Sequence, residues 1–169
     1  MPRRLFALDQ NFPQPIVSAL SEFMAEAELV ALADIDARLA DLDDWKVLLA
    51  LHHHEREWDG LLTTDAGMLS LPRELAVLMQ TRLTLVVAHA AGHDPLKATG
   101  LVLTYLPWIA AHTRRDAAQV WVLRAANKPA EDPWSHLEKI ASRKGTTATA
   151  LYDAEKLTNA ELGRNPLED

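Results

Sequence analysis

Short apolar runs alternate with longer amphipathic stretches along most of the chain. The apolar runs have the length of buried strands, and between them apolar residues recur at the three-to-four-residue spacing of helices. The pattern predicts strands over residues 5–8, 28–32, 60–63, 83–88 and 119–123. Strands that alternate with helices favour an α/β fold, a three-layer α/β/α sandwich around a central, mainly parallel five-stranded sheet.

Helical periodicity and end signals predict the intervening helices. Apolar residues at helical spacing follow Pro13 and Pro15, since proline is tolerated in a first helical turn. A second clear helix starts near residue 44, where Asp43 or Asp44 supplies the N-cap. In all, we expect helices over residues 15–24, 44–57, 72–80, 92–115 (kinked at Pro107) and 134–143.

The organisation of the chain changes after Asn127. Residues 1–126 read as one α/β domain, whereas 127–169 contain prolines, a Thr/Ala run and a polar end. We expect the second part to be a C-terminal extension, partly helical with a frayed end. The longest apolar region, residues 101–111, is shorter than the ~20 residues of a membrane span. With no cysteine and no signal-peptide core, the expectation is a cytoplasmic protein with no membrane partner.

Two predicted strands end in acidic or hydroxyl side chains. Residues 5–8 lead into Asp9 and Asn11, and residues 60–63 end in Thr63, followed by Thr64 and Asp65. Ligands of parallel α/β sheets bind beyond the carboxyl ends of the strands, so these groups are expected at one edge. Carboxylate oxygens there suit a hard divalent cation such as Mg²⁺.

Each carboxylate also has a purely structural interpretation. Aspartate is common in turns, which would account for Asp9 and Asp65. Asp44 could be a helix N-cap, and its neighbour Asp43 is equally well placed for that role. Three consecutive histidines, His52 to His54, cannot converge on one ion, because successive helical residues point about 100° apart.

The chain resembles the PIN-like nucleases in three segments. The opening Leu8-Asp9-Gln10-Asn11-Phe12-Pro13 is similar to the Leu-Asp-Glu-Asn-Leu-Pro opening of one branch. The run Asp44-Trp-Lys-Val-Leu-Leu-Ala50 is similar to the family's acid before a helix, and Thr63-Thr64-Asp65 to its Thr-x-Asp strand end. The resemblance covers roughly residues 5–123. It implies a ribonuclease dependent on Mg²⁺ or Mn²⁺, in many relatives the toxin of a toxin–antitoxin pair and commonly a homodimer.

The resemblance also implies roles for individual residues. Asp9, Asp44 and Asp65 would be the metal ligands and the catalytic acids, while Asn11, Thr63 and Thr64 would position substrate. In this hypothesis the metal activates a water for in-line attack on an RNA phosphodiester, and Asp65 takes the proton.

Two departures favour a different hypothesis. Gly67 stands where the family often has another acid, and Gln10 replaces a glutamate. The net charge of −7 also disfavours nonspecific attraction to nucleic acid. The alternative is a catalytically degenerate PIN-like module that binds RNA, an antitoxin or another protein partner.

Overall fold

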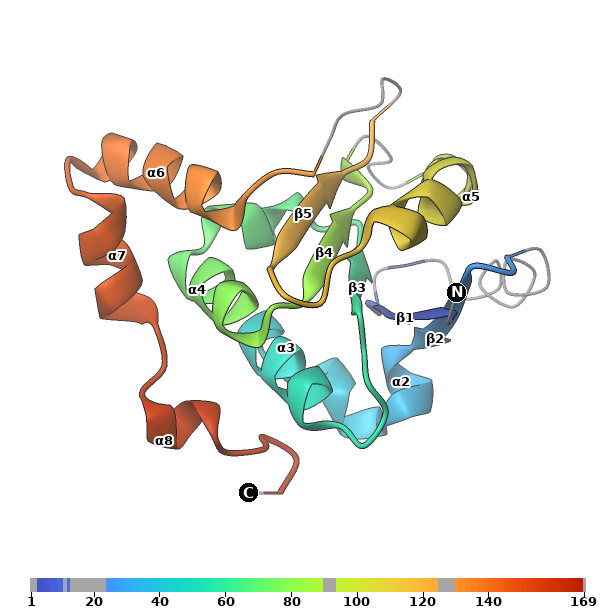
Figure 1. Ribbon diagram of the computed structural model, residues 1–169, viewed down its shortest axis with the longest axis horizontal. Helices are drawn as coiled ribbons and strands as arrows, with labels where there is room; N and C mark the ends of the chain where they lie inside the picture. Colours follow the sequence, from blue (N-terminus) through green and yellow to red (C-terminus); the bar gives the residue numbers. More distant parts are fainter. Residues whose placement is uncertain (1–2, 11, 13–23, 90–93, 125–129, 169) are drawn as a thin grey trace.

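A five-stranded, all-parallel sheet lies at the centre of the molecule (Figure 1). The computed structural model describes residues 3–10, 12, 24–89, 94–124 and 130–168. The strand order is β2-β1-β3-β4-β5. The strands are β1 (Arg4–Leu8), β2 (Ala27–Ala31), β3 (Gly60–Thr63), β4 (Thr84–Val87) and β5 (Gln119–Val122). The predicted α/β/α sandwich is confirmed, and its sheet is parallel throughout.

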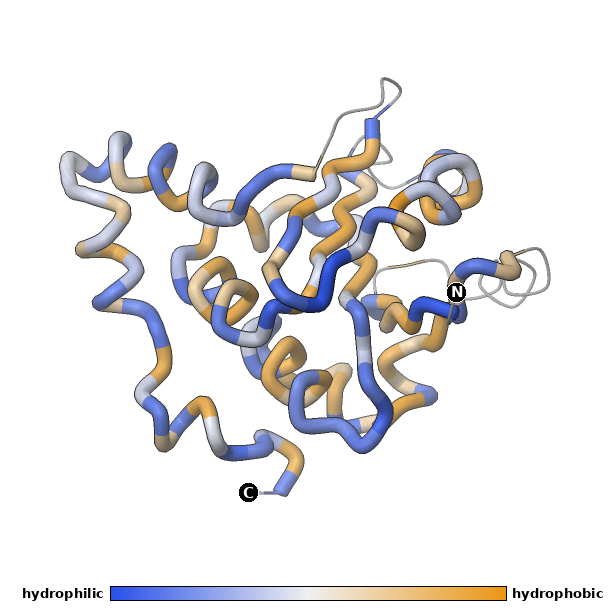
Figure 2. The backbone as a smooth tube through the Cα atoms, in the orientation of Figure 1, coloured by the Kyte–Doolittle hydropathy of each residue, from blue (hydrophilic) through white to orange (hydrophobic). Residues whose placement is uncertain are grey.

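Both faces of the sheet are buried, which is why its strands read as continuous apolar runs. Alternate residues of β1 point to opposite sides, with Phe6 and Leu8 in one hydrophobic core and Leu5 and Ala7 in the other. The hydropathy colouring of Figure 2 shows apolar segments inside and polar loops outside. Because successive side chains of a strand point to opposite faces, each strand contributes to the cores on both sides of the sheet.

The helices divide between these two faces. One core contains buried residues of α3 (Asp44–His53) and α4 (Pro72–Thr81), together with residues of the short elements α2 (Leu32–Ile35), η1 (Ala37–Asp41) and η2 (Ala66–Ser70). The other core contains one side of α5 (Pro95–His112). Among the described residues, no helix is both long and apolar enough to cross a membrane.

The helix bounds differ from the predictions mainly at their ends. Helix α3 stops at His53 rather than at residue 57, because His54 adopts an extended conformation as its C-cap. Helix α5 starts at Pro95 and contains Pro107. The helix predicted over residues 15–24 lies outside the described residues except for Met24, which is buried.

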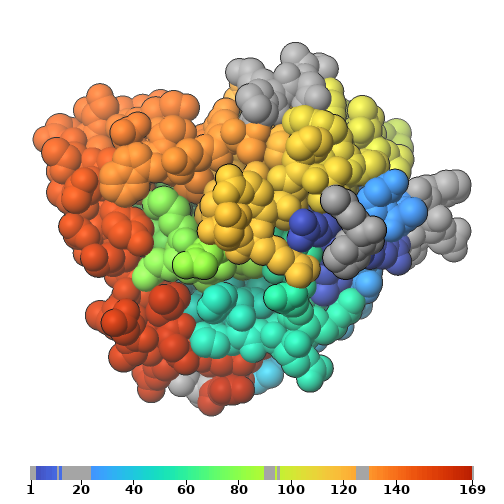
Figure 3. Space-filling view, in the orientation of Figure 1, coloured from blue at the N-terminus to red at the C-terminus, as the bar shows by residue number. Residues whose placement is uncertain are grey.

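Residues 130–168 form a C-terminal arm along one side of the molecule. It comprises α6 (Pro133–Lys144), α7 (Ala148–Glu155) and α8 (Asn159–Leu162). In Figure 3 its orange and red surface lies against α4 and α3. Where we expected frayed residues, His53 Nε2 lies 2.8 Å from the Leu162 carbonyl oxygen, and an Arg38 guanidinium nitrogen donates to the Leu167 carbonyl at 2.6 Å.

Candidate functional site

Asp9 and Thr63 meet where the neighbouring strands β1 and β3 end. Leu8 pairs with Leu62 in the ladder, and the next amide, that of Asp9, donates to the Leu62 carbonyl at 2.9 Å. The Thr63 hydroxyl then donates to Asp9 Oδ2 at 2.8 Å. The Asp9 side chain is buried, because only 7% of the residue is exposed. The predicted juxtaposition of these two strand ends is therefore present in the structure.

Asp65 is tied to the same cluster through its backbone. Its amide donates to the Thr63 hydroxyl at 2.9 Å, while its side chain is the N-cap of η2 and accepts from the Gly67 amide at 2.6 Å. A Cβ added at Gly67 would lie 2.7 Å from Asp65 Oδ1. An acid at position 67 would therefore displace the cap that Asp65 now forms. The expectation that Asp65 has a structural role in a turn is correct for Oδ1, which caps η2. Its Oδ2 takes no part in that cap.

Asp44 is the first residue of α3 and is half-buried. Burial raises the pKa of its carboxyl group, and the negative charges of Asp9, Asp65 and Asp43 raise it further. Asp43 occupies the N-cap position without a side-chain capping bond, and its carboxylate pairs instead with Lys46 at 3.0 Å. Capping therefore does not account for either acid. Asp9 and Asp65, which Thr63 links, thus lie near enough to Asp44 for their charges to act on it.

Glu74 is a fourth acid at this edge, which the sequence motifs did not identify. It lies in the first turn of α4, where a carboxylate also suits the helix dipole. Burial is the main reason that its pKa is raised, and the charges of Asp44 and Asp43 add to the shift. We refer to Asp9, Asp44, Asp65 and Glu74 as the acidic edge. No sequence motif could link Glu74 to the others, because only the packing of α3 on α4 brings it near Asp44.

Within the described part of the chain, no cation forms an ion pair with the acidic edge, although the charge of Arg73 opposes the rise in the pKa of Glu74. None of the ion pairs found there includes any of its four carboxylates. Its donor atoms are hard oxygens, which suit Mg²⁺ or Mn²⁺. Among the described residues, however, no three acidic or histidine side chains are placed so that they could hold a metal ion. The edge thus has the charge and the donor chemistry of a cation site, but its side chains do not surround a common point.

The remaining residues predicted for the site add no described contact to the acidic edge. Thr64 is half-buried beside Thr63, and Asn11 lies outside the described residues. The histidine run splays as predicted: His52 is exposed, His53 meets the C-terminal arm, and His54 Nδ1 accepts from the Arg56 amide at 2.9 Å.

At the opposite edge of the sheet, Asp59 is a buried carboxylate with a structural role. The Asp59 side chain is fully buried and accepts from Arg4 at 2.8 Å, Arg115 at 2.7 Å and the Leu5 amide at 2.9 Å. Burial opposes ionisation, but these donors, Arg115 first, hold the pKa of Asp59 below its ordinary value. A cavity of about 280 Å³ lies beside this network, and Arg115 at its wall is already paired with Asp59 and Glu57. The acidic edge has no such compensation among the described residues, so we place the candidate site there.

Comparisons of this chain with protein-family models, with curated proteins and with solved structures found no match.

Proposed function

We propose that the chain is a PIN-like, metal-dependent ribonuclease that acts at the acidic edge. The observation that carries the proposal is the uncompensated charge around Asp44, a half-buried acid whose pKa is raised by burial and by Asp9 and Asp65. Buried or half-buried carboxylates without cations destabilise a fold, and such sites persist where function requires them. A divalent cation would supply the missing charge.

The chemistry can be assigned to the chain's own groups. Asp9, Asp44 and Asp65 would hold the ion once their side chains turn towards a common point, with Glu74 beside them. When bound, Mg²⁺ or Mn²⁺ would lower the pKa of a water and neutralise charge on an RNA phosphodiester. Thr63 holds Asp9 in one orientation through its hydroxyl, and the Gly67 amide orients Asp65 through Oδ1. The second oxygen of Asp65 would then accept the proton of the attacking water.

A catalytically degenerate binding module is the second candidate. Two observations favour it: the described side chains do not surround one point, and Gly67 provides no further carboxylate. Such a module would keep the α/β scaffold and bind RNA or a protein partner without hydrolysis.

Calorimetric titration with Mg²⁺ and Mn²⁺ distinguishes the two candidates. We expect the wild type to bind the ion, Asp9→Asn to lose binding, and Asp41→Asn to retain it, because Asp41 is an exposed acid on η1. The wild type and Asp41→Asn should then cleave a labelled single-stranded RNA, and Asp9→Asn should not. Thermal melts confirm that each variant is folded. If the wild type neither binds the ion nor cleaves RNA, the nuclease proposal fails and the degenerate module replaces it.

A further inference from the structure

An aromatic ring flanked by two cations lies next to the acidic edge. Trp45, the second residue of α3, is half-buried. The Arg73 guanidinium carbon and the Lys46 ammonium nitrogen each lie 5.4 Å from the centre of its ring. Both distances fall within the range of cation–π contacts. We refer to Trp45, Lys46 and Arg73 as the cation cluster.

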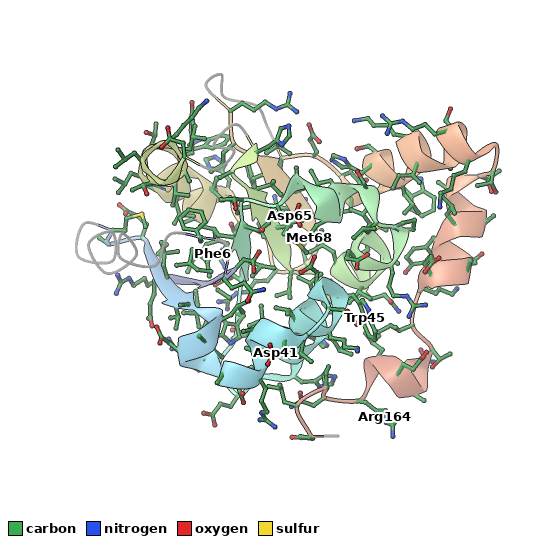
Figure 4. All side chains as sticks on the ribbon, turned by 180° about the vertical axis from the view of Figure 1, so that it is seen from behind. Phe6, Asp41, Trp45, Asp65, Met68 and Arg164 are labelled. Atoms are coloured by element: carbon green, nitrogen blue, oxygen red, sulfur yellow. The ribbon has the colours of Figure 1, made fainter. Side chains whose placement is uncertain are left out.

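The cation cluster and the acidic edge share the same two helix ends. Asp44 directly precedes Trp45 in α3, and Glu74 directly follows Arg73 in α4. The Arg73 guanidinium lies over the Trp45 ring, so the first turns of these helices are neighbours. Figure 4 shows Trp45 on the side of α3 that faces α4 and the C-terminal arm. The cation cluster and two acids of the edge thus come from the same two helical turns.

Helix stability does not explain cations at these positions. Lys46 and Arg73 lie in the first turns of their helices, where the helix dipole disfavours positive charge. Their ion pairs are solvent-accessible contacts, Lys46 with Asp43 at 3.0 Å and Arg73 with Glu155 at 3.3 Å. Accessible pairs of this kind contribute little to stability. Neither the helix dipole nor these ion pairs gives the two cations a large stabilising role.

We propose that Lys46 and Arg73 bind backbone phosphates of a single-stranded RNA whose scissile bond lies at the acidic edge. This inference rests on the proposed function. A guanidinium presents a planar fork that matches a phosphate, and an ammonium acts as a compact point charge. A protein of net charge −7 needs such local cations to hold RNA beside four carboxylates. Trp45 is a positioning residue, because its ring holds the Arg73 side chain in place.

Glu155 gives the C-terminal arm an influence on this contact. Its carboxylate in α7 lies 3.3 Å from Arg73 Nε, so it competes with phosphate for one side of the guanidinium. Removing the Glu155 charge should therefore strengthen RNA binding, whereas removing the Arg73 charge should weaken it. Because a change in net charge alone would give effects of the same signs, matched charge changes elsewhere in the chain are needed as controls.

Fluorescence anisotropy of a labelled single-stranded RNA in EDTA tests the inference without cleavage. We expect Arg73→Ala and Lys46→Ala each to weaken binding about 3- to 10-fold and to lower the salt slope by roughly 0.7. Arg73→Lys should fall between Arg73→Ala and the wild type, and Glu155→Gln should bind about 2-fold more tightly. Two matched controls should bind like the wild type. One is Lys97→Ala, at an exposed lysine on α5, and the other is Asp153→Asn on α7, whose carboxylate pairs with Lys156.

The outcomes separate this inference from the proposed function. If the cluster variants weaken binding while no protein cleaves RNA in Mg²⁺ or Mn²⁺, the phosphate contact stands and the nuclease proposal fails. If the wild type cleaves RNA but Arg73→Ala and Lys46→Ala, shown to be folded by thermal melts, bind with unchanged affinity and salt slope, the inference is overturned. An equal loss in Lys97→Ala would also overturn it, since total charge alone would then determine binding.

Discussion

The Thr63 hydroxyl lies 2.8 Å from Asp9 Oδ2 and donates a hydrogen bond to it. This side-chain bond joins the ends of the neighbouring strands β1 and β3, in addition to the backbone hydrogen bonds between them. Because the same hydroxyl accepts from the Asp65 amide, one buried threonine orders two of the acids at the edge. The arrangement of the acidic edge thus depends on a residue that carries no charge.

Thr63→Val should therefore destabilise the protein. Valine has the same shape, but it leaves a buried carboxylate oxygen and the Asp65 amide without their partner. We expect a loss of about 1–3 kcal/mol in the free energy of unfolding, measured with urea. Thr64→Val, a half-buried neighbour, should change it by less than about 0.5 kcal/mol. Equal effects of the two substitutions would show that the bond to Asp9 contributes nothing specific.

Asp44→Asn should stabilise the protein at neutral pH. The pKa of Asp44 is higher in the folded than in the unfolded state, so its ionised form opposes folding above the folded pKa. Removing the charge should raise the free energy of unfolding by about 0.5–2 kcal/mol at pH 7. The gain should shrink as the pH falls towards 3.8, the ordinary pKa. Asp41→Asn serves as the exposed control, and a destabilised Asp44→Asn would contradict the repulsion inferred at the acidic edge.

Asp59→Asn should have the opposite effect. The pKa of Asp59 is lower in the folded state, so its contribution to stability is present above about pH 4 and is lost as the pH falls through the folded pKa. Leaving Arg4 and Arg115 without their carboxylate should cost about 3–5 kcal/mol at pH 7. The difference from the wild type should narrow in urea titrations at acidic pH. Asp116→Asn, at an exposed pair with Arg114, should remain close to the wild type at every pH.

Alanine substitutions at two glycines should change the stability of the protein in opposite directions. A Cβ at Gly60 in β3 would overlap the Thr84 carbonyl oxygen, so Gly60→Ala must separate β3 from β4. We expect a loss of about 1–3 kcal/mol or more. Gly100 in α5 has no atom within 4 Å of the same position, and Gly100→Ala should stabilise by about 0.5–1 kcal/mol. Thermal melts of the two variants are sufficient, and a tolerated Gly60→Ala would contradict the close approach of β3 to β4.

The sheet could be predicted from the sequence because its strands are buried on both faces. Strands buried on both faces are unbroken apolar runs, and all five were located to within about a residue at either end. Helix ends were less predictable, as at His54, where the chain turns away although His54 and the residues after it could continue a helix. Helix α7 was not predicted, since its Thr/Ala-rich segment buries no residue and shows no apolar stripe.

The candidate site was only partly predictable. Asp9 and Thr63 could be paired in advance, because strand order in a parallel sheet brings carboxyl ends together. Glu74 and Arg73 could not, since they approach Asp44 and Trp45 only through the packing of two helices. The contact of Arg73 with Glu155 joins residues 82 positions apart and has no signature in local sequence.

The C-terminal arm is tied to the α/β domain by hydrogen bonds between residues far apart in the described sequence. The bonds from His53 to Leu162 and from Arg38 to Leu167 span 109 and 129 residues. Beyond α6, the arm nevertheless buries little of itself, because α7 and α8 contain no buried residue. The arm is accordingly the unit expected to open first in the native state, and amides of α8 should exchange hydrogen with solvent well before those of β1. Each transient opening would release Arg73 from Glu155, so the frequency of these openings would set how often the guanidinium is free.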